Sequence, residues 1–151
     1  MKMDELYKQL IIDHYRHPRN YGEINDMSSI RLFYKNPTCG DTIVLYLLVD
    51  QGQIHDIKFE GNGCSISMAS CSMMTSAVKG RSLEEAENLT RLFSSMITIG
   101  ISPEDEALEE SLSLLGVHSF RARHNCALMG WQALRKVINQ YKNDDSPPQQ
   151  V

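Results

Sequence analysis

The sequence predicts an α+β domain, in which helices pack on a small antiparallel sheet of about three strands. Three segments rich in β-branched and aromatic residues follow one another between residues 29 and 60, joined by short turns. After residue 64 the hydrophobic residues recur at helical spacing, and one more helix is expected ahead of the strands. Strands followed by helices, without strict alternation, are typical of α+β domains.

The chain of 151 residues corresponds in length to one domain. We expect residues 1–142 to form this single domain, without an internal repeat or a linker. Residues 143–151, NDDSPPQQV, contain no hydrophobic face to bury and are predicted to fray.

The first expected element is an N-terminal helix. Leu6, Leu10, Ile11 and His14 fall on one face of it. Because a proline disfavours helical geometry in the residue before it, the helix should end ahead of Pro18.

The three strands are predicted from their hydrophobic patterns. Residues 29–35 alternate between apolar and polar side chains. Residues 42–49 are apolar on both faces, which favours the central position in the sheet. Residues 53–60 alternate more weakly and follow a turn at 50–53.

Helices are expected over most of the remaining chain. One begins at Cys64, and a second begins at Ser82, where the sequence SLEE forms a capping box with Glu85. The polar residues and proline of 102–105 indicate a third start. Its leucines recur at helical spacing until Gly116, at Leu108, Leu112 and Leu115. The last helix has an apolar stripe formed by Ala127, Trp131, Leu134, Ile138 and Tyr141.

Charge and composition exclude several classes of function. The net charge of −4 is spread along the chain, so there is no basic stripe for nucleic acid and no polybasic flank for a membrane. Charges interrupt the N-terminal apolar pattern, so neither a signal peptide nor a membrane span is expected there. A cytoplasmic location is therefore expected. In that reducing compartment the four cysteines are interpreted as metal ligands or reactive thiols.

Three of the cysteines fall at junctions between predicted elements. Cys39 lies in the turn before the second strand, Cys64 lies where the third strand passes into a helix, and Cys126 lies at the start of the last helix. Because a helix N-terminus stabilises negative charge, Cys64 and Cys126 are expected to be biased toward thiolate. Gly61 and Gly63 would let backbone amides approach a bound group, or would simply shape the turn.

Asp41 is the candidate for a fourth ligand. It follows Cys39 by two residues, so the two side chains can point the same way in extended chain, and zinc accepts such mixed tetrahedral sets. The alternative is that Asp41 accepts a turn hydrogen bond. Ligands on three separate loops, without a C-x-x-C pair, favour a reachable site over a structural staple, although a staple stays open.

Cys71 is expected to be a core residue. It follows Cys64 by seven residues, or about 10 Å along a helix, which is too far for both to bind one metal ion. The methionines around it are also interpreted as core residues.

The segment before Cys126 offers further candidates. Asn125 is a candidate N-cap of the last helix. His124 is a ligand, a proton carrier or an exposed loop histidine, and the pattern leaves these open. Arg121 and Arg123 either hold Asp41 or a persulfide by charge, or are solvated.

Four segments, in this order, carry a family resemblance: LYKQLIIDHYRHPRNYG, NPTCGD, GNGCSISMAS and CALMGWQAL. Together they resemble the IscU/SufU proteins of iron-sulfur cluster assembly, also known from the N-terminal domain of NifU. The resemblance covers nearly the whole chain and implies a SufE/IscU-like fold. It also implies that Cys39, Cys64 and Cys126 are the family's functional cysteines and that Asp41 is its aspartate.

The resemblance is closer to SufU-type than to IscU-type members. IscU-type proteins carry a histidine directly before the third cysteine, where this chain has Asn125. Residues 102–116 are similar to the insertion of SufU-type proteins. The chain departs from the SufU pattern in lacking a lysine before Cys126, and Cys71 stands where the family usually has alanine or serine.

Two functions follow from the resemblance. If the chain is of SufU type, the resemblance implies a zinc-dependent sulfurtransferase. Zn²⁺ would then be bound by Cys39, Asp41, Cys64 and Cys126, and Cys39 would accept persulfide sulfur from a SufS-type cysteine desulfurase. An IscU-type protein is a non-enzymatic scaffold, on which the same residues hold a transient [2Fe-2S] cluster for transfer. The partners downstream would be a cluster scaffold or apo iron-sulfur proteins. A zinc-stapled interaction domain is the third alternative.

Overall fold

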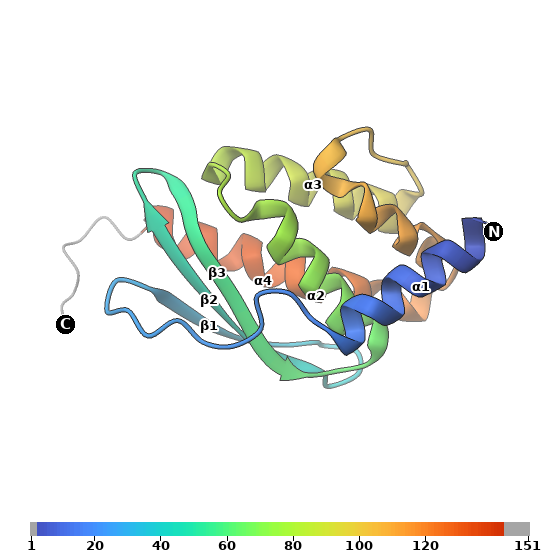
Figure 1. Ribbon diagram of the computed structural model, residues 1–151, viewed down its shortest axis with the longest axis horizontal. Helices are drawn as coiled ribbons and strands as arrows, with labels where there is room; N and C mark the ends of the chain where they lie inside the picture. The colour runs from blue at the N-terminus through green and yellow to red at the C-terminus, as the bar shows by residue number, and fades with distance from the viewer. Residues whose placement is uncertain (1–2, 144–151) are drawn as a thin grey trace.

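The computed structural model describes residues 3–143, and its centre is a three-stranded antiparallel sheet (Figure 1). The strands lie in the order β1-β2-β3, so the apolar middle segment is central, as the sequence predicts. The predicted fold class and the positions of all three strands are confirmed. The strands are β1 (Ile30–Lys35), β2 (Thr42–Asp50) and β3 (Gln53–Asn62).

Four α-helices accompany the sheet, and α2 and α4 pack directly on it. α1 packs against α2, and α3 packs against α4, so the outer helices are one layer further from the strands. The core lies between the sheet and the inner helices and continues to α3, whose Phe93 stacks on Trp131 of α4. The helices are α1 (Met3–Arg16), α2 (Ser65–Val78), α3 (Leu83–Ile99) and α4 (His124–Asn143).

α1 is held in place by a polar residue on its otherwise apolar face. His14 is fully buried; its Nδ1 lies 2.8 Å from Ser72 Oγ in α2, and its Nε2 lies 2.8 Å from Glu110 Oε1. Since both ring nitrogens are paired, the burial of this imidazole carries no unsatisfied group. His14 is therefore a structural tie between α1 and two distant parts of the chain.

The ends of α3 follow the sequence signals closely. Ser82 and Glu85 form the expected capping box, with Oγ and carboxylate each bonding the other residue's backbone N–H. Gly100 ends the helix at a φ of 76°, in the left-handed region that glycine enters readily.

The helix predicted between Asp105 and Gly116 is wrong in kind and in extent. Three 3₁₀ helices follow one another here and extend beyond Gly116: η1 (Glu106–Leu108), η2 (Glu110–Ser119) and η3 (Arg121–Arg123). Four of the buried side chains recur every three residues, which is the period of a 3₁₀ helix. They are Leu108, Ser111, Leu114 and Val117; Ser113 is also buried, outside this series. Two of the predicted leucines, Leu112 and Leu115, are only partly buried.

α4 confirms the last predicted helix and corrects two details. It begins at His124, directly after η3, so Asn125 lies inside the first turn and is not the N-cap. Tyr141, predicted on the apolar stripe, is 39 % exposed. Asn143 ends α4, and the rest of the predicted frayed tail, 144–151, lies outside the described residues.

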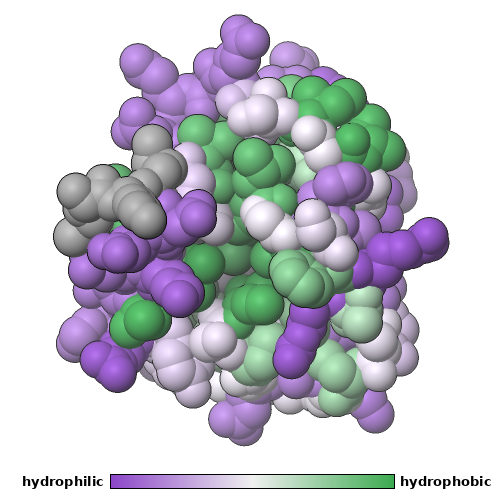
Figure 2. Space-filling view, turned by 90° about the vertical axis from the view of Figure 1, so that its right-hand side faces the viewer, coloured by the Kyte–Doolittle hydropathy of each residue, from purple (hydrophilic) through white to green (hydrophobic). Residues whose placement is uncertain are grey.

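The surface is mixed in character. The face at the right-hand side of Figure 1 carries a band of hydrophobic residues bordered by hydrophilic ones (Figure 2). Within residues 3–143, no helix combines the length and the apolar character needed to cross a membrane.

Candidate metal centre

The loop from residue 36 to residue 41 forms a tight, internally bonded turn that presents Cys39. Asn36 is buried; its backbone N–H donates to the Asp41 carbonyl over 2.7 Å, and its Oδ1 accepts from the Thr38 N–H. Gly40 has a φ of 81°, which allows the chain to reverse between the two ligand candidates. The turn leaves Cys39 exposed and directs Asp41 toward α2.

The N-terminus of α2 receives the Asp41 carboxylate. Oδ2 accepts from the Cys64 backbone N–H over 3.3 Å and from Ser67 Oγ over 2.7 Å. Cys64 is the N-cap of this helix, and its Sγ accepts from the Ser67 N–H over 3.5 Å. Gly63 leaves room for the carboxylate, since a Cβ there would lie 3.1 Å from Asp41 Cγ.

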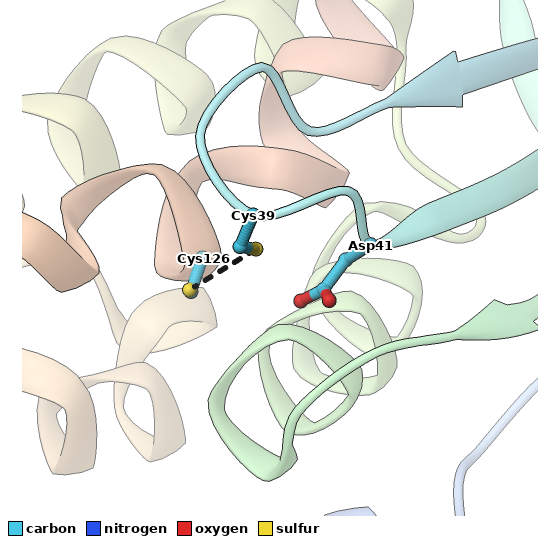
Figure 3. Close-up of side chains that lie close together, drawn as sticks. All are labelled: Cys39, Asp41 and Cys126. Carbon is cyan, nitrogen blue, oxygen red and sulfur yellow. Dashed lines mark hydrogen bonds between the residues drawn. The ribbon is translucent and has the colours of Figure 1, made fainter.

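The first turn of α4 brings in Cys126. Its Sγ lies 3.9 Å from Cys39 Sγ, and Figure 3 shows both thiols beside the Asp41 carboxylate, with the start of α2 below it. One ligand atom from each of Cys39, Asp41 and Cys126 lies within 4.8 Å of the other two. These three residues can therefore hold a metal ion.

The geometry fits zinc. Two thiolates bound at about 2.3 Å in a tetrahedron are separated by about 3.8 Å. The separation of 3.9 Å between the Cys39 and Cys126 sulfurs is close to this value. Cysteine sulfur with one carboxylate is also a donor set that zinc accepts.

Cys64, the fourth predicted ligand, belongs to the same corner but is oriented differently. Its Sγ lies 3.3 Å from Ser67 Oγ and caps α2, so it is outside the close group of three. Its backbone N–H nevertheless donates to the Asp41 carboxylate.

The electrostatics correct one expectation. Burial raises the pKa of the Cys126 thiol to about 11, although the Arg123 guanidinium works in the opposite direction. The predicted bias of Cys126 toward thiolate is therefore wrong: burial outweighs the helix N-terminus. Burial also acts to raise the pKa of Asp41, but the hydrogen bonds from Ser67 and Cys64 outweigh it and hold that pKa below its usual value.

The two candidates ahead of Cys126 point in different directions. Arg123 Nη1 lies 3.9 Å from Cys126 Sγ, so this guanidinium faces the thiol. His124 Nε2 lies 2.8 Å from the His118 carbonyl, and the two imidazoles stack. Its ring therefore holds the end of η2, away from the three ligand atoms.

Cys71 confirms its predicted place in the core. It is fully buried, and burial raises the pKa of its thiol to about 12. A Cβ at Gly130 of α4 would lie only 2.8 Å from the Cys71 Sγ. Helices α2 and α4 therefore pack closely at this point.

Sequence reasoning missed Ser67, which bonds Asp41 and Cys64 together. The available signal was its position three residues after Cys64, where the helix is expected to begin and where the N–H and side chain of such a residue face the cap. The partner, Asp41, is 26 residues away and could not be inferred from spacing.

Comparisons with known proteins agree with this picture. The family model of the NifU-like N-terminal domain matches residues 6–146. A Bacillus subtilis protein named zinc-dependent sulfurtransferase SufU is 47 % identical over 136 residues, covering 90 % of this chain and 91 % of that protein. A Streptococcus pyogenes protein named iron-sulfur cluster assembly scaffold protein IscU is 41 % identical over 142 residues, covering 94 % and 88 %.

The fold also matches a solved structure. A crystal structure from Fervidobacterium islandicum, described as a putative iron-sulfur cluster assembly scaffold protein for the SUF system, aligns with a TM-score of 0.80 at 28 % identity. The alignment covers 91 % of this chain and 99 % of that one. The chain therefore belongs to the IscU/SufU family of iron-sulfur cluster assembly proteins, which shares the NifU-like N-terminal domain.

Proposed function

We propose that this protein is a zinc-dependent sulfurtransferase of the SufU type, which accepts persulfide sulfur on Cys39. The observation that carries the proposal is the unequal exposure of the three thiols at the site. Cys39 is exposed, Cys64 is half-buried and Cys126 is buried. Only a thiol that a partner's cysteine can reach is able to attack its persulfide.

Zinc would be held by Cys39, Asp41, Cys64 and Cys126. When bound, it stabilises thiolates near neutral pH and takes no part in redox chemistry. The Cys126 thiol needs this stabilisation, because burial is the largest cause that raises its pKa to about 11. Arg123 supplies a fixed positive charge beside the same sulfur.

The transfer itself is a thiol exchange. The Cys39 thiolate attacks the outer sulfur of a cysteine persulfide on the donor protein, forming a new S–S bond. The original S–S bond of the donor breaks, and the donor's cysteine leaves as a thiolate. No net oxidation or reduction occurs, because the sulfane sulfur moves from one cysteine to another.

The partners follow from this chemistry. A cysteine desulfurase supplies the persulfide, and a downstream cluster scaffold or an apo iron-sulfur protein receives the sulfur. The relative named zinc-dependent sulfurtransferase SufU supports this assignment, since it is similar over nine-tenths of both chains.

The experiment is an alanine-release assay with a cysteine desulfurase of the SufS type. The zinc-loaded protein should increase the rate of alanine formation from cysteine, because it removes the persulfide. Cys39→Ala should lose this stimulation and keep its fold, since Cys39 is exposed. Cys71→Ala is the matched control and should stimulate normally. No stimulation by the unaltered, zinc-loaded protein would contradict the proposal.

A scaffold function on the same residues is the second candidate. The similarity to a protein named scaffold IscU favours it, and a single carboxylate among thiolates suits a cluster that is bound for later release. Anaerobic addition of iron and sulfide should then give a coloured [2Fe-2S] product that persists longer in Asp41→Ala. A colourless product that retains zinc would contradict this function.

A further inference from the structure

We infer that Ser67 is a positioning residue that makes Asp41 a one-oxygen ligand of the metal centre. The inference rests on the metal site of the proposed function, and concerns how tightly that site holds its ion. Ser67 is fully buried in the first turn of α2.

The two oxygens of the Asp41 carboxylate differ in the hydrogen bonds that they accept. Oδ2 accepts from Ser67 Oγ over 2.7 Å and from the Cys64 N–H over 3.3 Å. Within residues 3–143, Oδ1 receives no hydrogen bond that meets ordinary geometry. A carboxylate oxygen that already accepts two donors has little lone-pair capacity left, so Oδ1 remains for a cation.

Gly63 lets the carboxylate keep this position. A Cβ at Gly63 would lie 3.1 Å from both Cγ and Oδ2 of Asp41, which is tighter than normal packing. The absence of a side chain there therefore leaves the space that the carboxylate fills, and the two hydrogen bonds to Oδ2 fix its orientation.

Ser67 also contacts a second ligand candidate. Its Oγ lies 3.3 Å from Cys64 Sγ, and its backbone N–H donates to the same sulfur over 3.5 Å. One buried hydroxyl thus touches both Asp41 and Cys64. Hydrogen-bond partners of metal ligands typically change metal affinity about 10- to 100-fold when they are removed.

The test measures metal affinity directly. Zinc is titrated against a chromogenic chelator, and Co²⁺ is used to record the visible absorption of the site. Ser67→Ala should weaken zinc binding by about 10-fold or more and alter the Co²⁺ spectrum. Ser70→Ala is the matched control: Ser70 lies on the same helix, is equally buried, and bonds the Ala127 carbonyl away from Asp41. Its zinc affinity should be unchanged.

A double-mutant cycle separates positioning from simple structural support. If Ser67 acts through Asp41, Ser67→Ala should have less than about a twofold effect on affinity in the Asp41→Ala background. An equal loss in both backgrounds would overturn the inference. If Ser67→Ala does not fold, Gly63→Ala replaces it in the test, because its Cβ displaces the same carboxylate. Gly63→Ala should weaken zinc binding, and an unchanged zinc affinity would overturn the inference. If the unaltered protein bound neither zinc nor cobalt, the metal site itself would be refuted.

Discussion

Helix α2 carries two cysteines in opposite surroundings. Cys64 caps the helix, shares Ser67 with the Asp41 carboxylate, and is half-buried. Cys71 lies two turns further on, is fully buried, and faces Gly130 across the interface with α4. Cysteine thus belongs to a polar cluster at the N-terminus of α2 and to the apolar core two turns later. The helix end, where backbone donors are free, creates the difference.

Of the changes considered, removal of the metal from the Cys64 end of α2 should have the largest effect on the free energy of unfolding. A ligand present at 100 to 1,000 times its dissociation constant stabilises a fold by about 3–4 kcal/mol. We expect a chelator to lower the unfolding free energy by about that amount and to leave a cooperative transition, because the core around Cys71 does not depend on the site. Urea titrations with and without chelator measure it.

The opposite result would support the third alternative, a zinc staple. Structural zinc contributes on the order of 10 kcal/mol, so the chelated chain would then lose its cooperative transition entirely.

A substitution on the core side should have the next largest effect. Gly130→Ala places a Cβ 2.8 Å from Cys71 Sγ and 3.2 Å from its Cα. Overpacking costs about 1–3 kcal/mol, which exceeds the helix-propensity gain of about 0.5–1 kcal/mol. The variant should therefore be less stable by about 1–2 kcal/mol in urea denaturation. Adding Cys71→Ala should recover much of the loss; if the two losses simply add, the contact is not the cause.

The two thiols can also be compared through the same substitution. Cys71→Ala leaves a small cavity and should cost roughly 1–2 kcal/mol. Cys39→Ala changes an exposed side chain and should stay within about 0.5 kcal/mol in chelated protein. Denaturation of both variants, chelated, checks the ranking. Equal costs would mean that Cys39 is packed in a way that its exposure does not show.

The last prediction concerns a loss of stability at alkaline pH. Burial raises the pKa of Cys71 from 9.0 to about 12, so the unfolded chain releases this proton first. The contribution of Cys71 is complete below about pH 9 and declines as the pH rises toward about 12. Between about pH 8 and about pH 10.5, Cys71→Ala should lose less stability than the unaltered protein. If both proteins lost the same stability over this pH range, groups other than Cys71 would control the loss of stability at alkaline pH.

The parts of the fold that depend on local patterns could be predicted. The capping box at Ser82 and Glu85 involves neighbouring residues, and the alternation of the strands is visible in their sequence. The 3₁₀ segment could not be predicted, because its buried face includes Ser111, a polar residue that interrupts the apolar pattern. The leucines that do recur at helical spacing there suggested an α-helix instead.

The site was predictable to the same extent. Cys39, Asp41 and Cys126 could be proposed from their positions at element ends, and the structure brings them together. The hydrogen bonds of Ser67 and His14 could not, since their partners Asp41 and Glu110 are distant in sequence. The direction of His124 depended on where the 3₁₀ segment ends, which was itself unpredicted.

The distance along the chain between Cys39 and Cys126 determines when the candidate metal site is completed during synthesis of the protein. Cys39 and Cys126 are 87 residues apart, and the second of them enters the site only when α4 packs against the rest. A nascent chain that has not yet released residue 126 from the ribosome lacks one of the sulfurs. A metal ion that uses both sulfurs can therefore bind only after α4 has packed against the rest of the fold.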